Sequence, residues 1–209
     1  YPGYLSEVRG ADFSVRYYWE AGRLVERRSY ATSLGTVWQE VSESVGAGSE
    51  HIRKHYISSA QDYRILRHLV ENTILHPNDT ALHNKASELG QDGMIFGRTD
   101  RCPYQKILIE LAGPERFLVD LYADPEPALE LMEALERKMD EAFAMALESD
   151  VDVIWQPDNI TSDMTPPNAF EKYCLPLYRK RAAQARQIGK PYLIHMDGRL
   201  RVLAPLLNQ

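Results

Sequence analysis

The sequence predicts an α/β fold built on a parallel sheet, and three observations lead to this fold class. Short apolar segments, "DGMIFGR", "VDVIWQ" and "KPYLIHM", alternate with longer segments of helical periodicity. Strands of this kind, separated by helices, are typical of a parallel sheet that helices cover. No G-x-G-x-x-G or P-loop fingerprint follows any of them, which disfavours a nucleotide site and favours a (β/α)8 barrel over a doubly wound sheet.

The barrel is predicted to be incomplete. Complete barrels of this kind take about 250 residues or more, whereas three strand-helix units fill residues 92–209. We therefore interpret residues 1–209 as a single partial barrel domain that lacks strands at its C-terminal end. The chain begins with Tyr1 rather than Met and ends just after a helix has begun, which indicates processing or a longer parent protein.

Two kinds of element precede the barrel strands. Residues 12–42 are rich in aromatic and β-branched residues, and "EAGR" divides them, which predicts a β-hairpin that continues into a further strand. In "SAQDYRILRHLVENTI" the apolar residues have a 3-4 spacing, with Ser59 as N-cap and Asp62 three residues later, so an amphipathic helix is predicted. "NDTALHNKASELG" predicts a second helix that ends at Gly90.

The remaining helices are predicted between and after the apolar strands. They are "PYQKILIELAGPERFLVDLY", "DPEPALELMEALERKMDEAFAMALESD" and "PPNAFEKYCLPLYRKRAAQARQIG". We expect the last of these to be interrupted near Pro176, because proline removes an amide donor and clashes with the preceding turn. "RLRVLAPLL" predicts the start of another helix.

Composition excludes several classes of function. There are 24 Lys and Arg against 30 Asp and Glu, and the net charge of -6 gives no basic footprint for a nucleic acid. No apolar run approaches the roughly 18 residues of a membrane span, and the N-terminus does not resemble a signal peptide, so a cytoplasmic protein is expected. Cys102 and Cys174 are far apart in sequence, which predicts free thiols rather than a disulfide framework.

Polar residues follow each of the three predicted strands. In a parallel barrel the functional groups come from the carboxyl ends of the strands and from the loops after them. The candidates are Arg98, Thr99, Asp100 and Arg101 after the first strand, Gln156, Asp158, Asn159, Thr161, Ser162 and Asp163 after the second, and His195 and Asp197 after the third. The alternative for Ser162 and Asp163 is to cap the helix that opens at Pro166.

These residue types suit metal binding, proton transfer or anion binding. Residues two apart on a strand project to the same side, so His195 and Asp197 can converge on one metal ion or one proton. Arg98 or Arg101 can bind an anionic group bidentately, or be a surface charge. Asp158 either faces the same site or belongs to a turn after Pro157.

The segment "DVIWQPDNITSDMTPPNAFEKYCLPLYRKRAAQARQIGKPYLIHMDG" resembles the centre of the uroporphyrinogen decarboxylase-like superfamily, which includes the decarboxylases and the methylcobamide:thiol methyltransferases. Weaker similarity extends upstream through "GMIFGRTDRCPYQKILIELAGPERFLVDLYADPE" and the N-terminal hairpin. The resemblance implies a TIM barrel and a homodimer. The matching residues are Asp158, Pro166, Phe170 and Pro176 in the family's "aDvi...D" and "lsP..F..f..P" segments, and His195 and Gly198 in its "lHxCG" strand end.

The methyltransferase branch implies a metal. In that branch the His and Cys of "HxC", with a distant cysteine, hold a zinc ion that activates the acceptor thiol. Asp197 replaces the cysteine here, and zinc accepts carboxylate oxygen, although a carboxylate also lets manganese or magnesium compete. The resemblance thus implies metal-assisted methyl transfer from a corrinoid or other donor to a thiol, with a corrinoid protein as partner. Metal ligands would be His195 and Asp197, with Asp158 orienting the substrate and a further ligand expected beyond Gln209.

Two alternatives stay open. The first is a decarboxylase of a tetrapyrrole polycarboxylate, which requires no cofactor. In it Arg98 or Arg101 binds the acetate groups and Asp158 stabilises a protonated pyrrole. Whichever reaction applies, Arg98, Arg101, Gln156 and Asn159 are the predicted substrate-binding residues. The second is a non-catalytic barrel, in which His195 and Asp197 hydrogen-bond only to each other or to the backbone.

Overall fold

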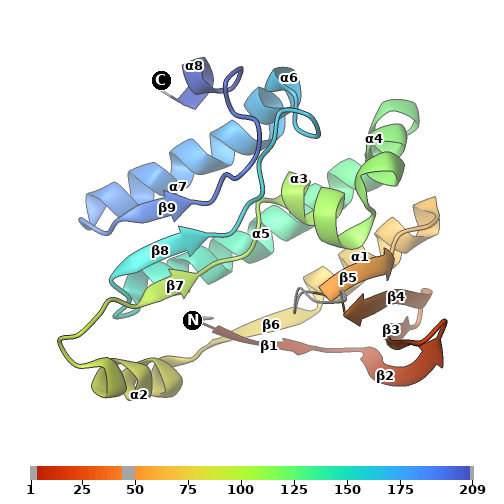
Figure 1. Ribbon diagram of the computed structural model, residues 1–209, viewed down its shortest axis with the longest axis horizontal. Helices are drawn as coiled ribbons and strands as arrows, with labels where there is room; N and C mark the ends of the chain where they lie inside the picture. The colour runs from red at the N-terminus through yellow and green to blue at the C-terminus, as the bar shows by residue number, and fades with distance from the viewer. Residues whose placement is uncertain (1–3, 44–49, 208–209) are drawn as a thin grey trace. The chain divides into compact units, whose positions relative to one another are not determined.

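The computed structural model describes residues 4–43 and 50–207 (Figure 1). The chain divides into two compact units. The hairpin unit consists of residues 8–73 and 107–134, and the parallel-sheet unit of residues 1–7, 74–106 and 135–209. The interpretation of residues 1–209 as one domain stays a prediction.

The hairpin unit is built on a four-stranded antiparallel sheet of order β2-β3-β4-β5. Its strands are β2 (Ala11–Glu20), β3 (Arg23–Thr32), β4 (Gly35–Glu43) and β5 (Glu50–Lys54). Ala21 and Gly22, which join β2 to β3, have φ of 49° and 74°, the backbone that a two-residue type I′ turn requires. The predicted hairpin with a further strand is confirmed.

Helix α1 (Ala60–Glu71) packs against β4. Ser59 and Asp62 form the predicted capping box, in which each side chain accepts a backbone N–H of the other residue. The apolar residues at the predicted 3-4 spacing are buried on one face, among them Tyr63, Ile65 and Leu69. The first predicted helix is therefore confirmed, although it ends three residues earlier than its apolar pattern.

A second layer of the hairpin unit comes from residues 107–134. It contains a π-helical turn η1 (Ile107–Leu111), α4 (Pro114–Ala123) and the first part of α5 (Glu126–Glu148). Hydrogen bonds join this layer to the sheet and to α1. They run from Gln39 Nε2 to Glu110 O at 2.7 Å, from Ile57 N to Leu111 O at 2.8 Å, and from Tyr63 Oη to Asp120 Oδ2 at 3.0 Å.

The parallel-sheet unit contains β7 (Phe96–Arg98), β8 (Val153–Gln156) and β9 (Tyr192–Ile194). They pair in parallel in the order β7-β8-β9, as Figure 1 shows. The three predicted strands are thus confirmed, and the fold is mixed α/β. Within residues 4–43 and 50–207 the strands do not close into a barrel, so the TIM barrel stays a prediction.

The core of the parallel-sheet unit lies between β8 and the helices α5 and α7 (Leu175–Gln187). Phe143 and Ala146 of α5 and Ala185 of α7 pack with Ile154, and each is at most 5% exposed. The covering of a parallel strand by helices explains why Val153, Ile154 and Trp155 of β8 are all apolar, without alternation.

Two short strands, β1 (Tyr4–Val8) and β6 (Thr73–Pro77), were not predicted from the sequence, and they pair with each other. Helix α2 (Asp79–Leu89) ends at Gly90 as predicted, where φ is 57°. The remaining helical segments are α3 (Pro103–Lys106), α6 (Pro167–Ala169), the π-helical turn η2 (Phe170–Cys174) and α8 (Ala204–Leu207).

The predicted interruption near Pro176 is present as a change of helix type. The π-helical turn η2 ends at Cys174, and Pro176 occupies the first turn of α7. Proline is tolerated there because the amides of a first turn have no carbonyl partner within the helix. Cys102 and Cys174 are both free, as predicted, and both are buried. No helix of the described segments is long and apolar enough to cross a membrane.

Candidate active site at the carboxyl ends of the parallel strands

The segments that follow β7, β8 and β9 stay hydrogen-bonded to one another beyond the ends of the strands. Thr99 N, just after β7, donates to Trp155 O of β8 at 2.9 Å, and His195 N, just after β9, donates to Gln156 O of β8 at 2.9 Å. The loops after β8 and β9 are joined further on by Gly198 N to Ile160 O at 3.1 Å and by Ser162 N to Arg199 O at 2.9 Å. The polar residues that the sequence analysis singled out therefore lie on connected segments with a defined backbone.

The loops after β8 and β9 approach each other very closely at Gly198. A Cβ added at Gly198 would lie 2.1 Å from Cβ of Thr161 and 2.7 Å from its Cα. Only glycine fits at such a distance from another backbone. Thr161 Oγ1 also accepts the amide of Arg199 at 3.2 Å, so this contact fixes the path of the chain just after His195 and Asp197.

His195 is an exposed residue whose ring forms hydrogen bonds through one nitrogen, Nδ1. Nδ1 lies 3.0 Å from the backbone oxygen of Asp158 and 3.2 Å from Oδ1 of Asn159. A carbonyl oxygen can only accept, so Nδ1 carries a proton, and in the neutral ring the lone pair then lies on Nε2. The imidazole and the Trp155 ring have an edge-to-face arrangement, with 6.4 Å between their centroids. This arrangement is typical of a histidine that ligates a metal or accepts a proton through Nε2.

The carboxylate of Asp158 lies in a different environment. It is fully buried, and three donors surround it: Cys102 N at 2.9 Å from Oδ1, and Tyr178 Oη at 2.6 Å and Gln156 Nε2 at 2.5 Å from Oδ2. Burial raises the pKa of Asp158, and these hydrogen bonds offset part of that increase. The carboxylate ties the loop after β7, the end of β8 and helix α7 together.

The orientation of the Gln156 amide is fixed from its other end. Oε1 accepts hydrogen bonds from Arg181 Nη1 at 2.8 Å and from Tyr192 Oη at 2.5 Å. Nε2 must then face Asp158, which accepts from it. Gln156 is fully buried, and its predicted role as a substrate contact stays a prediction.

The two candidate arginines differ in availability. Arg98 is exposed, its guanidinium lies 5.9 Å from the centroid of the Trp155 ring, and it has no hydrogen bond or ion pair within the described residues. Arg101 is half-buried and donates from Nη1 to Pro157 O. Asp100 accepts Lys106 Nζ at 3.0 Å. Arg98 is therefore the cation of this edge that is open to an anionic ligand.

At this edge of the sheet the predicted metal ligands are only two side chains, His195 and Asp197. Asp197 is exposed, two residues after His195. In the part of the chain that the structure describes, no three His, Cys, Asp or Glu side chains lie close enough together to hold a metal. An imidazole nitrogen and a carboxylate oxygen are chemically suitable zinc ligands, so His195 and Asp197 fit as part of a coordination sphere.

The structure brings some predicted residues together and separates others. His195 and Asn159 are in contact, Trp155 lies between Arg98 and His195, and Asp158 reaches His195 only through its backbone oxygen. The sequence analysis missed the buried polar partners Tyr178, Arg181 and Tyr192. The available signal was the spacing of Tyr178, Arg181 and Ala185, which places three buried residues on one face of α7.

Comparison with known proteins agrees with the resemblance in the sequence. The family model of uroporphyrinogen decarboxylase (URO-D) matches residues 107–209. This range includes β8, β9, α7 and both of the loops that carry Asp158 and His195. No curated protein matches the chain. Residues 107–209, just under half of the chain, are therefore similar to the uroporphyrinogen decarboxylase family.

Proposed function

We propose that the protein is a metal-assisted methyltransferase that moves a methyl group from a corrinoid or another methyl donor to a thiol acceptor. The observation that carries this proposal is the environment of His195. Its Nδ1–H donates to a backbone carbonyl, and the side chain is exposed, which in the neutral ring leaves the lone pair of Nε2 for a ligand. A metal-ligating histidine usually has this arrangement, because the second hydrogen bond fixes the tautomer and the ring orientation.

A divalent metal, zinc in the first instance, would be held by His195 Nε2 and the Asp197 carboxylate. When bound, it supplies the Lewis acidity that lowers the pKa of a thiol. The loop hydrogen bonds around Gly198 hold the backbone that carries both ligands. Asp158 acts in this scheme as a positioning residue, because its backbone oxygen orients the imidazole while its carboxylate anchors the loop to α7.

The exposed surface beside His195 suits an anionic substrate or donor. The imidazole and the Trp155 ring have an edge-to-face arrangement, and the guanidinium of Arg98, which has no ion pair within the described residues, lies 5.9 Å from the centroid of the Trp155 ring. A guanidinium held near an aromatic ring loses little freedom when it binds a carboxylate or phosphate. We assign Arg98 to substrate binding and leave Arg101 to its bond with Pro157 O.

The test measures metal and methyl transfer in the same protein. Four purified proteins are loaded with zinc and desalted: the wild type, His195→Ala, Asp197→Ala and the control Asp163→Asn. Asp163 is an exposed carboxylate of the neighbouring loop. Metal content is then measured, and the loss of methylcobalamin absorbance is followed with a thiol present. We expect zinc to be retained by the wild type and the control, and to be lost with the transfer activity in the other two variants. Wild-type protein without stoichiometric zinc, manganese or iron after reconstitution would refute the proposal.

A second function is favoured by one observation, the free guanidinium of Arg98 beside Trp155. A decarboxylase acting on a tetrapyrrole polycarboxylate needs such a cation to bind the carboxylate side chains. Incubation with uroporphyrinogen, followed by counting the carboxyl groups of the product, tests this alternative. Decarboxylation by the metal-free wild type that is lost in Arg98→Gln would favour it over methyl transfer.

A further inference from the structure

Cys102 and Cys174 lie side by side in the interior of the parallel-sheet unit. Their Sγ atoms are 3.7 Å apart, and both residues are 0% exposed. Cys102 belongs to the loop after β7, and Cys174 is the last residue of η2, so 72 positions of sequence separate the two thiols. Neither thiol takes part in the proposed contacts with a metal or a substrate.

The two sulfur atoms are close enough for a small movement to join them. A disulfide bond is about 2.05 Å long, so the sulfurs must approach each other by about 1.7 Å from their separation of 3.7 Å. Each sulfur is one bond away from its Cβ, so rotation about χ1 changes its position while the Cα stays in place. A disulfide therefore requires a local adjustment and no rearrangement of the fold.

The backbone at Cys174 is not that of a regular helix. Cys174 ends the π-helical turn η2 and has φ of -109° and ψ of -49°, whereas φ in an α-helix is about -63°. Pro176, two residues later, has no amide to donate to the preceding turn. Single π-helical turns are rare and occur frequently at functional sites. We expect the segment of Cys174 to be the part that adjusts when the sulfurs approach.

Cys102 connects the pair of thiols to the buried carboxylate of Asp158. The N–H of Cys102 donates to Asp158 Oδ1 at 2.9 Å. Its Sγ lies 3.7 Å from Tyr178 Oη, which donates to Asp158 Oδ2 at 2.6 Å. The backbone oxygen of Asp158 in turn accepts from His195 Nδ1. A movement of Cys102 therefore changes the position of the residue that orients His195.

We propose that Cys102 and Cys174 are a redox-sensitive pair, which hydrogen peroxide converts reversibly into a disulfide that displaces Asp158. One sulfur, as its thiolate, attacks an oxygen of the peroxide, so that a sulfenic acid forms and hydroxide leaves. The other sulfur, as its thiolate, then attacks the sulfenic sulfur, the S–S bond forms, the S–O bond breaks, and a second hydroxide leaves. The two sulfurs lose two electrons to the peroxide, and the two thiol protons convert the hydroxides into water.

Burial makes this reaction slow and selective. It raises the pKa of the Cys102 thiol, so little thiolate is present at neutral pH, and an isolated buried thiol is inert for this reason. This pair differs from an isolated thiol, because a second sulfur 3.7 Å away captures a sulfenic acid as soon as local opening lets one form. Peroxide is also small and neutral, whereas bulky thiol reagents are excluded from a fully buried site.

Mass spectrometry tests whether the disulfide forms in the folded protein. The wild type, Cys102→Ala and Cys174→Ala are treated with hydrogen peroxide, and the remaining thiols are then alkylated in denaturant. Digestion of the wild type should yield a linked peptide pair that contains both cysteines, with two hydrogens fewer than the separate peptides, and dithiothreitol should restore both thiols. Neither single variant should yield this pair. A wild type whose two cysteines are still alkylated, or that forms the disulfide only after circular dichroism shows unfolding, overturns the proposal.

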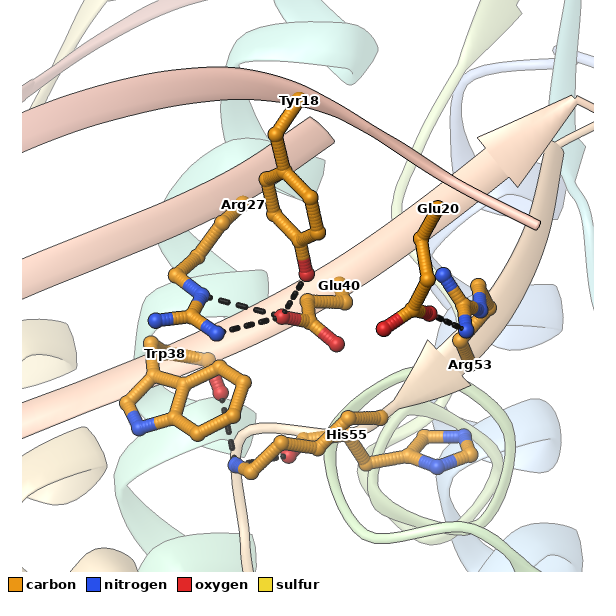
Figure 2. A network of polar contacts seen from close by, with 8 residues as sticks. Tyr18, Glu20, Arg27, Trp38, Glu40, Arg53 and His55 are labelled. Carbon is orange, nitrogen blue, oxygen red and sulfur yellow. Dashed lines mark hydrogen bonds and ion pairs between the residues drawn. The ribbon is translucent and has the colours of Figure 1, made fainter. Parts of the chain in front are cut away.

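Tryptophan fluorescence tests whether the disulfide displaces Asp158 and thereby the surroundings of His195. Of the three tryptophans only Trp155, whose ring lies beside His195, belongs to the parallel-sheet unit. Trp38 lies under the Arg27 guanidinium in a polar network of the hairpin unit, which contains no cysteine (Figure 2). After removal of the peroxide, the emission should differ between the oxidised and reduced wild type. This difference should persist in Trp38→Phe and disappear in Trp155→Phe.

Equal emission of the two forms, or a difference that persists in Trp155→Phe, overturns the displacement of Asp158. Neither the mass nor the fluorescence measurement requires a substrate or a metal. The inference can therefore fail or hold independently of the proposed methyl transfer.

Discussion

His195 and Asp158 contact each other through a ring nitrogen and a backbone oxygen, and not through their two ionisable groups. His195 Nδ1 lies 3.0 Å from Asp158 O, while the Asp158 carboxylate is buried among Cys102, Gln156 and Tyr178. One residue therefore joins the exposed edge of the sheet to its interior. The carboxylate sets the position of the loop, and the loop sets the orientation of the imidazole.

Replacing His195 separates a catalytic from a structural role. We expect His195→Ala to lower transfer activity by a factor of about 10²–10⁴, the contribution of a positioned catalytic side chain. Because the side chain is exposed, the free energy of unfolding should change by less than about 1 kcal/mol. Steady-state kinetics and urea denaturation measure the two effects. A non-catalytic barrel predicts the reverse, a loss of stability with ligand binding unchanged.

Replacing Asp158 by asparagine should destabilise the protein although the shape is retained. The amide nitrogen of asparagine would face Cys102 N–H on one side, or the Tyr178 and Gln156 donors on the other. An unsatisfied buried donor costs about 1–3 kcal/mol, and we expect Asp158→Asn to lower the free energy of unfolding by this amount at neutral pH. Asp163→Asn, an exposed position, is the matched control.

The difference in stability between the wild type and Asp158→Asn should depend on pH, because the pKa of Asp158 is raised, mainly by burial. Between the unfolded pKa, about 3.9, and the raised folded pKa, the folded state binds more protons than the unfolded state. Wild-type stability relative to Asp158→Asn should then fall as the pH rises through this interval and become constant above it. Urea denaturation of both proteins from pH 4.5 to 8 measures it. A relative stability that rises with pH would contradict a raised pKa.

Gly198→Ala should reduce activity without touching a catalytic side chain. The new methyl group would overlap Thr161, including its backbone, so the loop that carries His195 and Asp197 must move. Overpacking of this kind costs about 1–3 kcal/mol, and the displaced ligands should lower metal affinity. Gly189→Ala is the control, since it introduces backbone strain at φ 70° with no atom within 4 Å. It should lose stability but retain activity and metal.

His55 should make the hairpin unit sensitive to mild acid. Burial lowers the pKa of His55, whose Nε2 lies 3.1 Å from Ile109 O. Because the folded pKa lies below the unfolded value of about 6.5, this contribution to stability is present above pH 6.5 and is lost as the pH falls below it. His55→Gln does not titrate, so its melting temperature should change less between pH 8 and pH 5 than that of the wild type. An identical change in both proteins would contradict this assignment.

The sequence predicted those parts of the fold that local signals specify. The capping box of Ser59 and Asp62, the turn at Ala21 and Gly22 and the apolar segment of β8 each act within a few residues of chain. Strands β1 and β6 were missed because each is short and is stabilised by a partner about seventy residues away. The π-helical turns were missed because no residue pattern distinguishes them from an α-helix.

For the residues of the candidate site, the place in the chain was easier to predict than the direction in which each side chain points. The positions of Asp158 just after β8 and of His195 just after β9 were predicted correctly, and their functional roles stay predictions. A place in the chain does not determine which way a side chain in a loop points, and the three donors around the Asp158 carboxylate come from β8, the loop after β7, and α7. That orientation depends on tertiary packing. The same holds for Arg181, whose sequence context "YRKRAAQ" is that of an exposed helix although the side chain is fully buried.

Replacement of Arg181 should show that its charge adds little to stability. Its guanidinium is fully buried, and in the described chain Nε and Nη2 have no hydrogen-bond partner. Arg181→Met keeps most of the packing volume and removes the unpaired donors, and Gln156 Oε1 still accepts from Tyr192. Replacing a buried charge by an apolar side chain of similar size is often neutral or stabilising, so we expect a change in unfolding free energy within about 1 kcal/mol.

Arg181→Ala is the matched variant, because it removes the same charge and also leaves a cavity. Deleting a large buried side chain costs about 2–5 kcal/mol, so the alanine variant should be clearly less stable than the methionine variant in urea denaturation. Equal and large losses in both variants would mean that the guanidinium itself stabilises the fold, through the bond from Nη1 to Gln156 and its position 5.1 Å from the Phe143 ring centroid. The network from Arg181 through Gln156 to Asp158 would then be a source of stability, and loss of Arg181 would also disturb the orientation of His195.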